Sequence, residues 1–306
     1  MNTAMQTAIS ILLVSPFPLA LAQDASTEPQ WIEFDAQAYA GYGYDSNVSV
    51  SEIDTNTGEG DSALYAKGKV KASITPHEKW QLNTSAQYAL TEYNDYSVFN
   101  LAITTLSAEA VYKADWAKVA LHHYSADAKL DDSDYLTYRQ TGLSVGRAWQ
   151  QKGYWRLSVD NISKIFVATP ERDSDANALR SDVFWFNEAQ AFWQFGFTFQ
   201  QEDAQDNTFD YTSYLADVAY TTPLTWLHKD TEFTLSYHYE TRDYAGAREG
   251  GIGRNDNRQR IKAVIDYPVS RHVDVMLSTQ YGNYSSTTDS ADYKETLAEL
   301  GMKLHF

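Results

Sequence analysis

The sequence contains no cysteine and only 7 prolines in 306 residues. Without cysteine there is no disulfide, no thiolate nucleophile and no cysteine-ligated zinc site. The chain also lacks any run of about 18 apolar residues, which excludes helices that cross a membrane. Positive charge is scarce, because 24 Lys and Arg stand against 41 Asp and Glu and give a net charge of -17. This balance argues against a nucleic-acid partner, since phosphate backbones need a basic surface.

What the sequence has in abundance is aromatic residues, which make up 14% of the chain. They are dispersed among polar residues rather than collected in apolar blocks. Strands that alternate between lipid-facing and lumen-facing positions produce this mixture, because half of each strand can be polar.

The N-terminus predicts export. An apolar stretch runs from Ile9 to Ala22, is interrupted by two prolines and ends in Ala20-Leu21-Ala22. This pattern indicates a signal peptide over residues 1–22, although no Lys or Arg precedes it. A short membrane anchor is the alternative, but the stretch is too short and too broken to span a bilayer. We expect a periplasmic leader at 23–30 and one barrel domain at 31–306.

From Ile32 onward the dominant pattern has a period of two, which places successive side chains on opposite faces of a strand. The first strand sorts into an apolar face and a polar face: Ile32, Phe34, Ala36, Ala38, Ala40, Tyr42 and Tyr44 against Glu33, Asp35, Gln37 and Gly41. The pattern recurs around 64–74, 80–88, 193–200 and 232–240. A soluble β-sandwich explains the alternation equally well.

The connections between these segments alternate in length. Short ones fall near 75–79, 113–115, 150–153 and 268–272; longer, acidic ones run over 46–62, 127–134, 168–181, 203–210, 244–257 and 285–292. Short periplasmic turns and long outer loops are typical of outer-membrane barrels. The fold class predicted is therefore all-β, an antiparallel up-and-down transmembrane β-barrel of about fourteen strands, with twelve or sixteen as alternatives. The turn within 183–192 is not visible in the sequence.

The last strand ends the chain on an aromatic residue. Thr296, Ala298, Leu300, Met302, Leu304 and Phe306 share one face. A terminal Phe after an alternating strand resembles the signal that outer-membrane proteins present to the barrel-assembly machinery. Aromatic residues also cluster at predicted strand ends, where they would form interfacial girdles: Trp80, Tyr112, Trp116, Trp149, Tyr154, Trp155, Tyr220, Tyr267, Tyr281 and Tyr293.

These features together resemble Gram-negative outer-membrane β-barrel proteins over essentially the whole mature chain. The segment Gly43-Tyr44-Asp45-Ser46-Asn47-Val48 also loosely resembles the barrel domain of surface lipoprotein assembly modifiers. That resemblance implies a role in delivering lipoproteins to the cell surface. The family carries a helical-repeat periplasmic domain before its barrel, where this sequence has the short leader.

Several charged residues fall on the faces predicted to line the lumen. These are Lys67, Lys69, Lys71, Glu232, Glu240, Arg242, Arg258, Arg260, Lys262, Asp274 and Glu299. They predict either a selectivity surface for passing solutes or a set of cross-strand ion pairs that hold the wall together. The basic residues form two rows, a first one of Lys67, Lys69 and Lys71 and a second one of Arg258, Arg260 and Lys262. Acids on neighbouring strands are available to compensate both rows, including Glu33 and Asp35 for the first.

Catalytic and metal sites are weakly indicated. The one compact His/Ser cluster, His122-His123-Tyr124-Ser125, puts its two histidines on opposite faces, which does not favour a hydrolase. Asp131-Asp132-Ser133-Asp134 lacks the spacing and the glycine of a calcium loop. We therefore expect no enzyme, no cofactor and no metal.

The function predicted is a porin-like channel for small hydrophilic solutes in the outer membrane. A barrel that assists assembly or secretion through a periplasmic or surface partner is the alternative, and a barrel hydrolase is a third. The expected partners are outer-membrane lipid, lipopolysaccharide and, during biogenesis, the assembly machinery acting on Phe306. The expected oligomeric state is a monomer, with no nucleic-acid partner.

Overall fold

The computed structural model describes residues 31–150, 152–187, 190–228, 230–247 and 253–306. The predicted signal peptide (1–22) and leader (23–30) lie outside the described residues. Over the ranges given, no helix is both long enough and apolar enough to cross a membrane.

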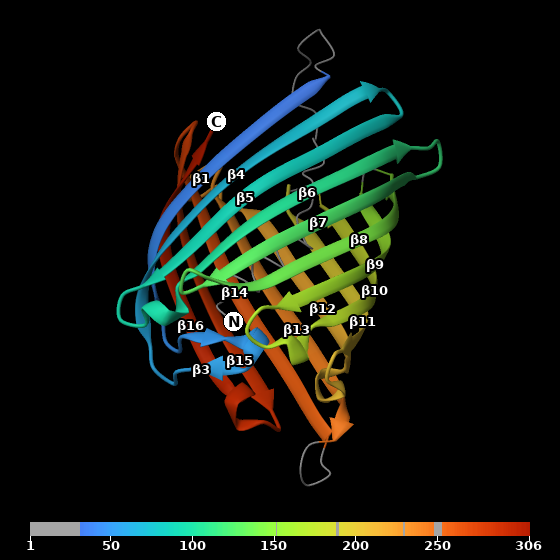
Figure 1. The fold of residues 1–306 in the computed structure, drawn as a ribbon. Helices are drawn as coiled ribbons and strands as arrows, with labels where there is room; N and C mark the ends of the chain where they lie inside the picture. Colours follow the sequence, from blue (N-terminus) through green and yellow to red (C-terminus); the bar gives the residue numbers. More distant parts are fainter. Residues whose placement is uncertain (1–30, 151, 188–189, 229, 248–252) are drawn as a thin grey trace.

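The described chain forms one closed antiparallel barrel of fourteen strands (Figure 1). Its strands are β1 (Ile32–Asp45), β4 (Asp61–His77), β5 (Trp80–Tyr93), β6 (Leu101–Lys113), β7 (Lys118–Leu130), β8 (Ser133–Trp149), β9 (Gly153–Phe166), β10 (Ser174–Phe186), β11 (Phe192–Ala204), β12 (Tyr211–Pro223), β13 (Glu232–Ala247), β14 (Gly253–Ser270), β15 (Val273–Ser286) and β16 (Tyr293–His305). Each strand pairs with the next along the chain, and β1 pairs with β16. The predicted fold class and strand number are confirmed.

The two ends of the barrel differ as predicted. We call the end with the connections at 78–79, 114–117, 150–152, 187–191, 224–231 and 271–272 the turn end, and the opposite one the loop end. The loop end carries four short 3-10 helices besides the one in the first loop: η2 (Ser97–Phe99), η3 (Pro170–Arg172), η4 (Asn207–Phe209) and η5 (Asp289–Ala291). The turn hidden within 183–192 lies between β10 and β11.

One predicted loop is wrong. Residues 127–134 do not form a long acidic loop, because β7 runs on to Leu130 and β8 begins at Ser133. The two-residue turn between them has φ of 49° at Asp131 and 59° at Asp132. Aspartate tolerates this left-handed conformation, and a two-residue hairpin turn with positive φ at both positions matches the twist of the strands. The predicted loop 168–181 is also shorter than expected, because β10 already begins at Ser174.

The period-two pattern separates an apolar outer face from a polar inner face. On β11, Phe195 and Phe197 are 41% and 50% exposed, whereas Gln194 is 4% exposed. Aromatic residues also pair on the outer face at the turn end, where the rings of Trp80 and Tyr112 lie 4.9 Å apart. Tyr293 is an exception to the predicted girdles: it is buried and stacked on Tyr284 with ring centroids 4.5 Å apart.

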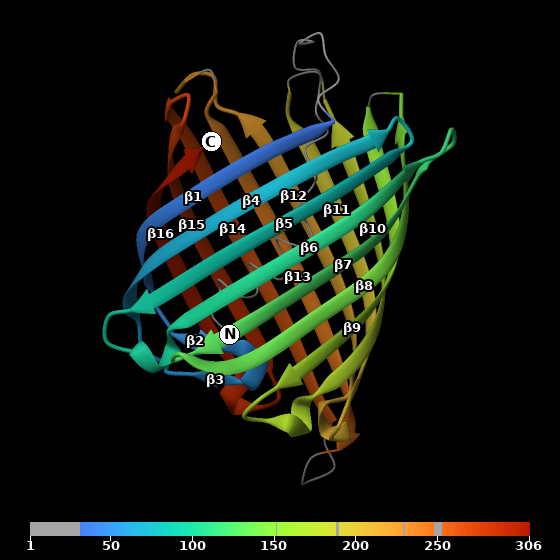
Figure 2. The ribbon, with the colours of Figure 1, turned by 45° about the horizontal axis from the view of Figure 1, so that its top comes forward.

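The loop after β1 turns into the barrel. Within residues 46–60, β2 (Ser49–Val50), η1 (Ser51–Ile53) and β3 (Thr55–Asn56) form a small hairpin. Figure 2 shows it as the short blue arrows among the strand ends of the loop end. Val50 packs in an apolar cluster with inward-facing residues of β6 to β10, among them Ile103, Tyr138 and Ile162. This cluster forms one wall of the lumen at the loop end, and the inserted loop covers it.

Candidate functional site

The candidate site is the inner face of the barrel. All eleven charged residues predicted to line the lumen lie on the strand face opposite the exposed apolar side chains. On β14, for example, Arg258 is buried whereas Ile261 is 44% exposed.

The first basic row lies on β4. Lys71 reaches Asp35, with 3.9 Å between Nζ and Oδ1, as the sequence predicts. The other predicted acid, Glu33, is instead opposite Ser73 in the ladder. Lys67 and Lys69 stand opposite Tyr39 and Gln37 on β1. Of the two acids predicted to compensate the positive charge of this row, only Asp35 forms an ion pair with one of its lysines.

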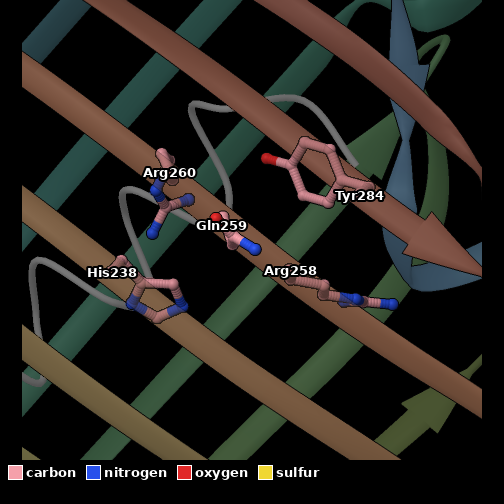
Figure 3. Close-up of a pocket in the computed structure, with 5 residues that line it drawn as sticks. All are labelled: His238, Arg258, Gln259, Arg260 and Tyr284. Atoms are coloured by element: carbon pink, nitrogen blue, oxygen red, sulfur yellow. The ribbon is translucent and has the colours of Figure 1, made fainter.

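The second basic row lies on β14 and is partly compensated. Arg258 Nη2 lies 3.5 Å from Asp256 on its own strand, while Glu240, directly opposite Arg258, accepts a 2.8 Å hydrogen bond from Arg242. A pocket of about 170 Å³ is lined by His238, Arg258, Gln259, Arg260 and Tyr284. In Figure 3 the Arg260 guanidinium turns toward the His238 ring, whereas Arg258 extends the other way.

The remaining predicted acids have separate partners. Asp274 Oδ2 lies 2.7 Å from His305 Nε2. Glu299 Oε1 accepts a 2.6 Å hydrogen bond from the Tyr39 hydroxyl. Glu232 stands opposite Asp266, which pairs with Lys303.

A set of cross-strand ion pairs on β7 to β13 was not predicted. His122 Nε2 and Asp160 Oδ1 are 2.5 Å apart, and this pair passes over Gly142 on the strand between them. Asp182 binds both Arg156 and Arg180, each at 2.9 Å. Asp217 lies 2.7 Å from His238. The inner-face glycine at 142 is the signal that could have revealed the first pair, since it leaves room above the strand for side chains to meet.

The inserted loop is fixed to the barrel by charged hydrogen bonds. Asp54 accepts from Arg254 on β14 at 2.6 and 2.7 Å and from Arg172 in η3 at 2.8 Å. Arg172 also donates to the Glu52 carbonyl at 2.8 Å. Burial alone would raise the pKa of Asp54, but the hydrogen bonds from Arg254 and the charge of Arg172 hold that pKa well below its usual range. Asp54 is therefore ionised at neutral pH and binds the loop to two strand ends.

A second contact of the loop involves Glu52. Its carboxylate lies 3.9 Å from Lys164 Nζ, which also lies 2.8 Å from Glu202. Burial opposes ionisation of Glu52, yet Lys164, Arg242 and Arg258 together lower its pKa. A pocket of about 300 Å³ remains here, lined by Glu52, Lys164, Phe166, Arg172, Glu202, Phe209, Tyr211, Arg242 and Tyr244. Sequence reasoning missed this loop insertion entirely.

Solved structures of similar fold include outer-membrane proteins. The chain matches outer-membrane expressed OmpT of Vibrio cholerae with a TM-score of 0.55 and 12% identity, covering 90% of this chain and 97% of that chain. It matches the anion-selective porin from Comamonas acidovorans with a TM-score of 0.52 and 8% identity, covering 90% and 99%. The fold is that of an outer-membrane β-barrel.

Comparison of the sequence itself gives no closer assignment. No protein-family model matches the chain, and no curated protein matches it. The resemblance to surface lipoprotein assembly modifiers therefore stays a prediction.

In this barrel Phe306 lies at the seam where β1 pairs with β16. Its backbone N–H donates to the Ala36 carbonyl at 2.9 Å, and its side chain is 77% exposed on the outer face. The residue therefore continues the closing pair of strands and presents its ring outward. Its role as an assembly signal stays a prediction.

The His/Ser cluster on β7 is divided between the two faces of the wall, as its spacing predicts. His123 Nδ1 lies 2.8 Å from the Thr141 hydroxyl on the exposed side. His122 faces inward and binds Asp160, whose second oxygen accepts from the Ser158 hydroxyl at 3.1 Å. The Ser158 hydroxyl thus contacts the Asp160 carboxylate, whereas a nucleophilic serine must contact the imidazole.

Proposed function

We propose that this chain forms an outer-membrane channel for small hydrophilic solutes. The observation that carries the proposal is the inner face of the closed barrel, where Lys67, Lys69 and Lys262 remain partly accessible instead of being packed in an apolar core. An inner face of this kind suits water and solutes better than it suits a purely structural wall. One protein of similar fold is an anion-selective porin, which also supports a channel function.

The inserted loop would set the width of this channel. Loops inside a pore determine size selectivity when they are held rigidly, and Asp54 is held here by two arginines. Ser49 in β2 contributes a further anchor, with its hydroxyl 3.4 Å from Glu295 on β16. We therefore place the narrowest part of the path at the loop end, beside residues 46–60.

The experiment is solute uptake by liposomes that contain the refolded full chain. Uptake of uncharged sugars of increasing size measures whether a pore is open and how wide it is, independently of any preference for anions or cations. We expect small sugars to cause swelling and larger ones to be excluded, relative to liposomes without protein. Impermeability to every sugar tested would overturn the channel function.

The proposal also covers the membrane environment of the barrel, its oligomeric state and its lack of enzymatic activity. The exposed apolar outer face, including Phe195, Leu277 and Leu300, would lie in outer-membrane lipid, with lipopolysaccharide around the loop end. We propose a monomer without hydrolytic activity, because the Ser158 hydroxyl beside His122 and Asp160 donates to the carboxylate and not to the imidazole. Release of fatty acid from phospholipid by the refolded protein, lost in His122→Ala, would contradict this part.

A further inference from the structure

Five lysines gather on one section of the inner wall, formed by β14, β16 and β4. We call Lys67, Lys69, Lys71, Lys262 and Lys303 the lysine patch. Lys67 on β4 and Lys303 on β16 stand opposite the same residue of β1, Tyr39, and Lys262 on β14 lies within electrostatic reach of Lys67. Lys262 in turn has Arg260 and Lys303 among its neighbours. Strands far apart in the sequence therefore bring like charges to one place.

Five acids also lie on this section of the wall, Asp35, Glu232, Asp266, Asp274 and Glu299, and two of them form ion pairs with lysines of the patch. Asp35 lies 3.9 Å from Lys71, and Asp266 pairs with Lys303. Glu299 is a neighbour of Lys67 and Lys262 and offsets part of their charge, while its Oε1 accepts a hydrogen bond from the Tyr39 hydroxyl. In the part of the chain that the structure describes, no ion pair joins Lys67, Lys69 or Lys262 to a carboxylate.

These three lysines also remain accessible from the lumen. Lys67, Lys69 and Lys262 are each partly exposed, in contrast to the buried Arg258 nearer the loop end. Residues two apart on a strand are spaced by roughly 7 Å, so Lys67, Lys69 and Lys71 present a regular line of cations. Like charges at this spacing repel, and an anion that enters between them relieves the repulsion.

The inner wall on β7 to β10 carries ion pairs in which acid and base lie together. Asp182 is shared by Arg156 and Arg180, and Asp160 is bound by His122. Each of these carboxylates has a basic side chain within 2.9 Å, whereas no carboxylate of the described residues forms an ion pair with Lys67, Lys69 or Lys262. The net charge of -17 does not decide the matter either, because a charge more than about 10 Å away is largely screened at physiological salt.

We propose, on the basis of the channel function above, that the lysine patch binds small solutes with carboxylate or phosphate groups and makes the pore selective for anions. The solute would lie along β4, with its acidic groups against Lys67, Lys69 and Lys262. Lysine suits this role because its ammonium group is a flexible point charge that accepts anions of varied shape. Transit requires weak binding at several sites in sequence, which a line of separate cations provides.

The first test is the reversal potential of the full chain in a planar bilayer across a potassium chloride gradient. We expect the wild type to favour chloride. The triple variant Lys67→Gln, Lys69→Gln, Lys262→Gln should reduce the chloride-to-potassium permeability ratio by roughly tenfold at low salt, with a smaller change at high salt. The triple arginine variant, which keeps the charge, should retain the preference.

The matched control removes three lysines from outside the lumen: Lys79→Gln, Lys129→Gln and Lys152→Gln. The side chains of Lys79 and Lys129 are 43% and 56% exposed in surface ion pairs, and Lys152 lies in an exposed turn. This variant has the same change in net charge and should keep the wild-type selectivity. A wild-type pore that favours potassium, or equal loss of selectivity in the control, overturns the role of the patch.

A second test does not depend on conduction. Equilibrium dialysis of the refolded wild type with radiolabelled inorganic phosphate should show saturable binding, reduced at least several-fold in the triple glutamine variant. Competition by succinate would support a site for carboxylates as well, and its absence would restrict the ligand to phosphates. If sugars do not permeate but phosphate binds, the channel function fails and the anion site stands. If sugars permeate and phosphate does not bind, the site fails alone.

Discussion

Arg254 donates two hydrogen bonds to the carboxylate of Asp54, at 2.7 Å to Oδ2 and 2.6 Å to Oδ1, although 200 positions separate the two residues. Asp54 has a φ of 54°, a left-handed conformation that aspartate tolerates better than most residues. The pair is almost fully buried, with side-chain exposures of 1% for Arg254 and 7% for Asp54. A buried charged contact between distant parts of the sequence thus helps to hold the loop inside the barrel.

Replacing Asp54 with Asn should release the loop. Asparagine keeps the size and the left-handed backbone but leaves the Arg254 and Arg172 charges without a counterion. Removing one partner of a buried ion pair costs about 3–5 kcal/mol, and here that cost falls on the docked state of the loop. We expect larger single-channel conductance and protease cleavage within 46–60. Asp131→Asn, at an exposed turn residue with φ of 49°, is the control and should change neither.

The pH dependence of loop docking follows from the same carboxylates. The pKa of Asp54 and the pKa of Glu52 are both lowered in the folded chain. Their contribution is fully present above the unfolded value of about 4 and is lost as the pH falls through the lowered folded values. We therefore expect conductance to stay at its neutral value down to about pH 4 and to rise only below it. Loop release between pH 5 and pH 7 would show that other groups control docking.

Gly142 should tolerate no side chain. A Cβ at this position would lie 2.1 Å from Asp160 Oδ1 and 2.6 Å from His122 Nε2, so Gly142→Ala would separate the pair. Overpacking of this kind costs about 1–3 kcal/mol. Gly68→Ala is the matched control, because nothing lies within 4 Å of its added Cβ. The unfolding midpoint in urea should fall for the first variant alone, and equal midpoints would mean that the wall adjusts without loss.

The barrel was predictable from the sequence because its signal is local. Alternation around Phe195 and Phe197, and the connection lengths, depend on neighbours a few residues apart, so the strand faces and a number of about fourteen strands could be predicted, with twelve and sixteen left open. The short turn at Asp131 and Asp132 was misread because a cluster of acidic residues is typical of both tight turns and long loops. Hairpin geometry, which tolerates aspartate with positive φ, decided between them.

The inserted loop and the ion pairs were not predictable from this single sequence. Nothing local indicates that Asp54 meets Arg254, since their contact arises from closure of the barrel and from the register of fourteen strands. The partner of Lys71 was found because β1 and β4 are consecutive in the barrel. The partner of His122 lies two strands away, across Gly142, and alternation alone carries no information about that distance.

Deletion of Phe306 should reduce the amount of assembled protein sharply while export continues. The Phe306 backbone pairs with Ala36 at the seam, and its ring is 77% exposed, so the residue contributes little packing inside the barrel. A loss of assembly without a matching loss of stability would therefore indicate recognition of the ring. Phe34→Ala, which removes a ring that is 78% exposed on the neighbouring strand, is the control.

Assembly can be measured from outer-membrane fractions on gels run with and without boiling. A closed barrel has no free strand edge and should remain folded in detergent, so the unheated protein should migrate faster. We expect this fast band to be strong for the wild type and for Phe34→Ala and weak for the deletion. To separate biogenesis from stability, both variants should also be refolded in detergent, where no assembly machinery acts. Equal refolding yields with unequal yields in cells support recognition of Phe306, whereas a deletion that also fails to refold shows that the residue is needed to close the seam.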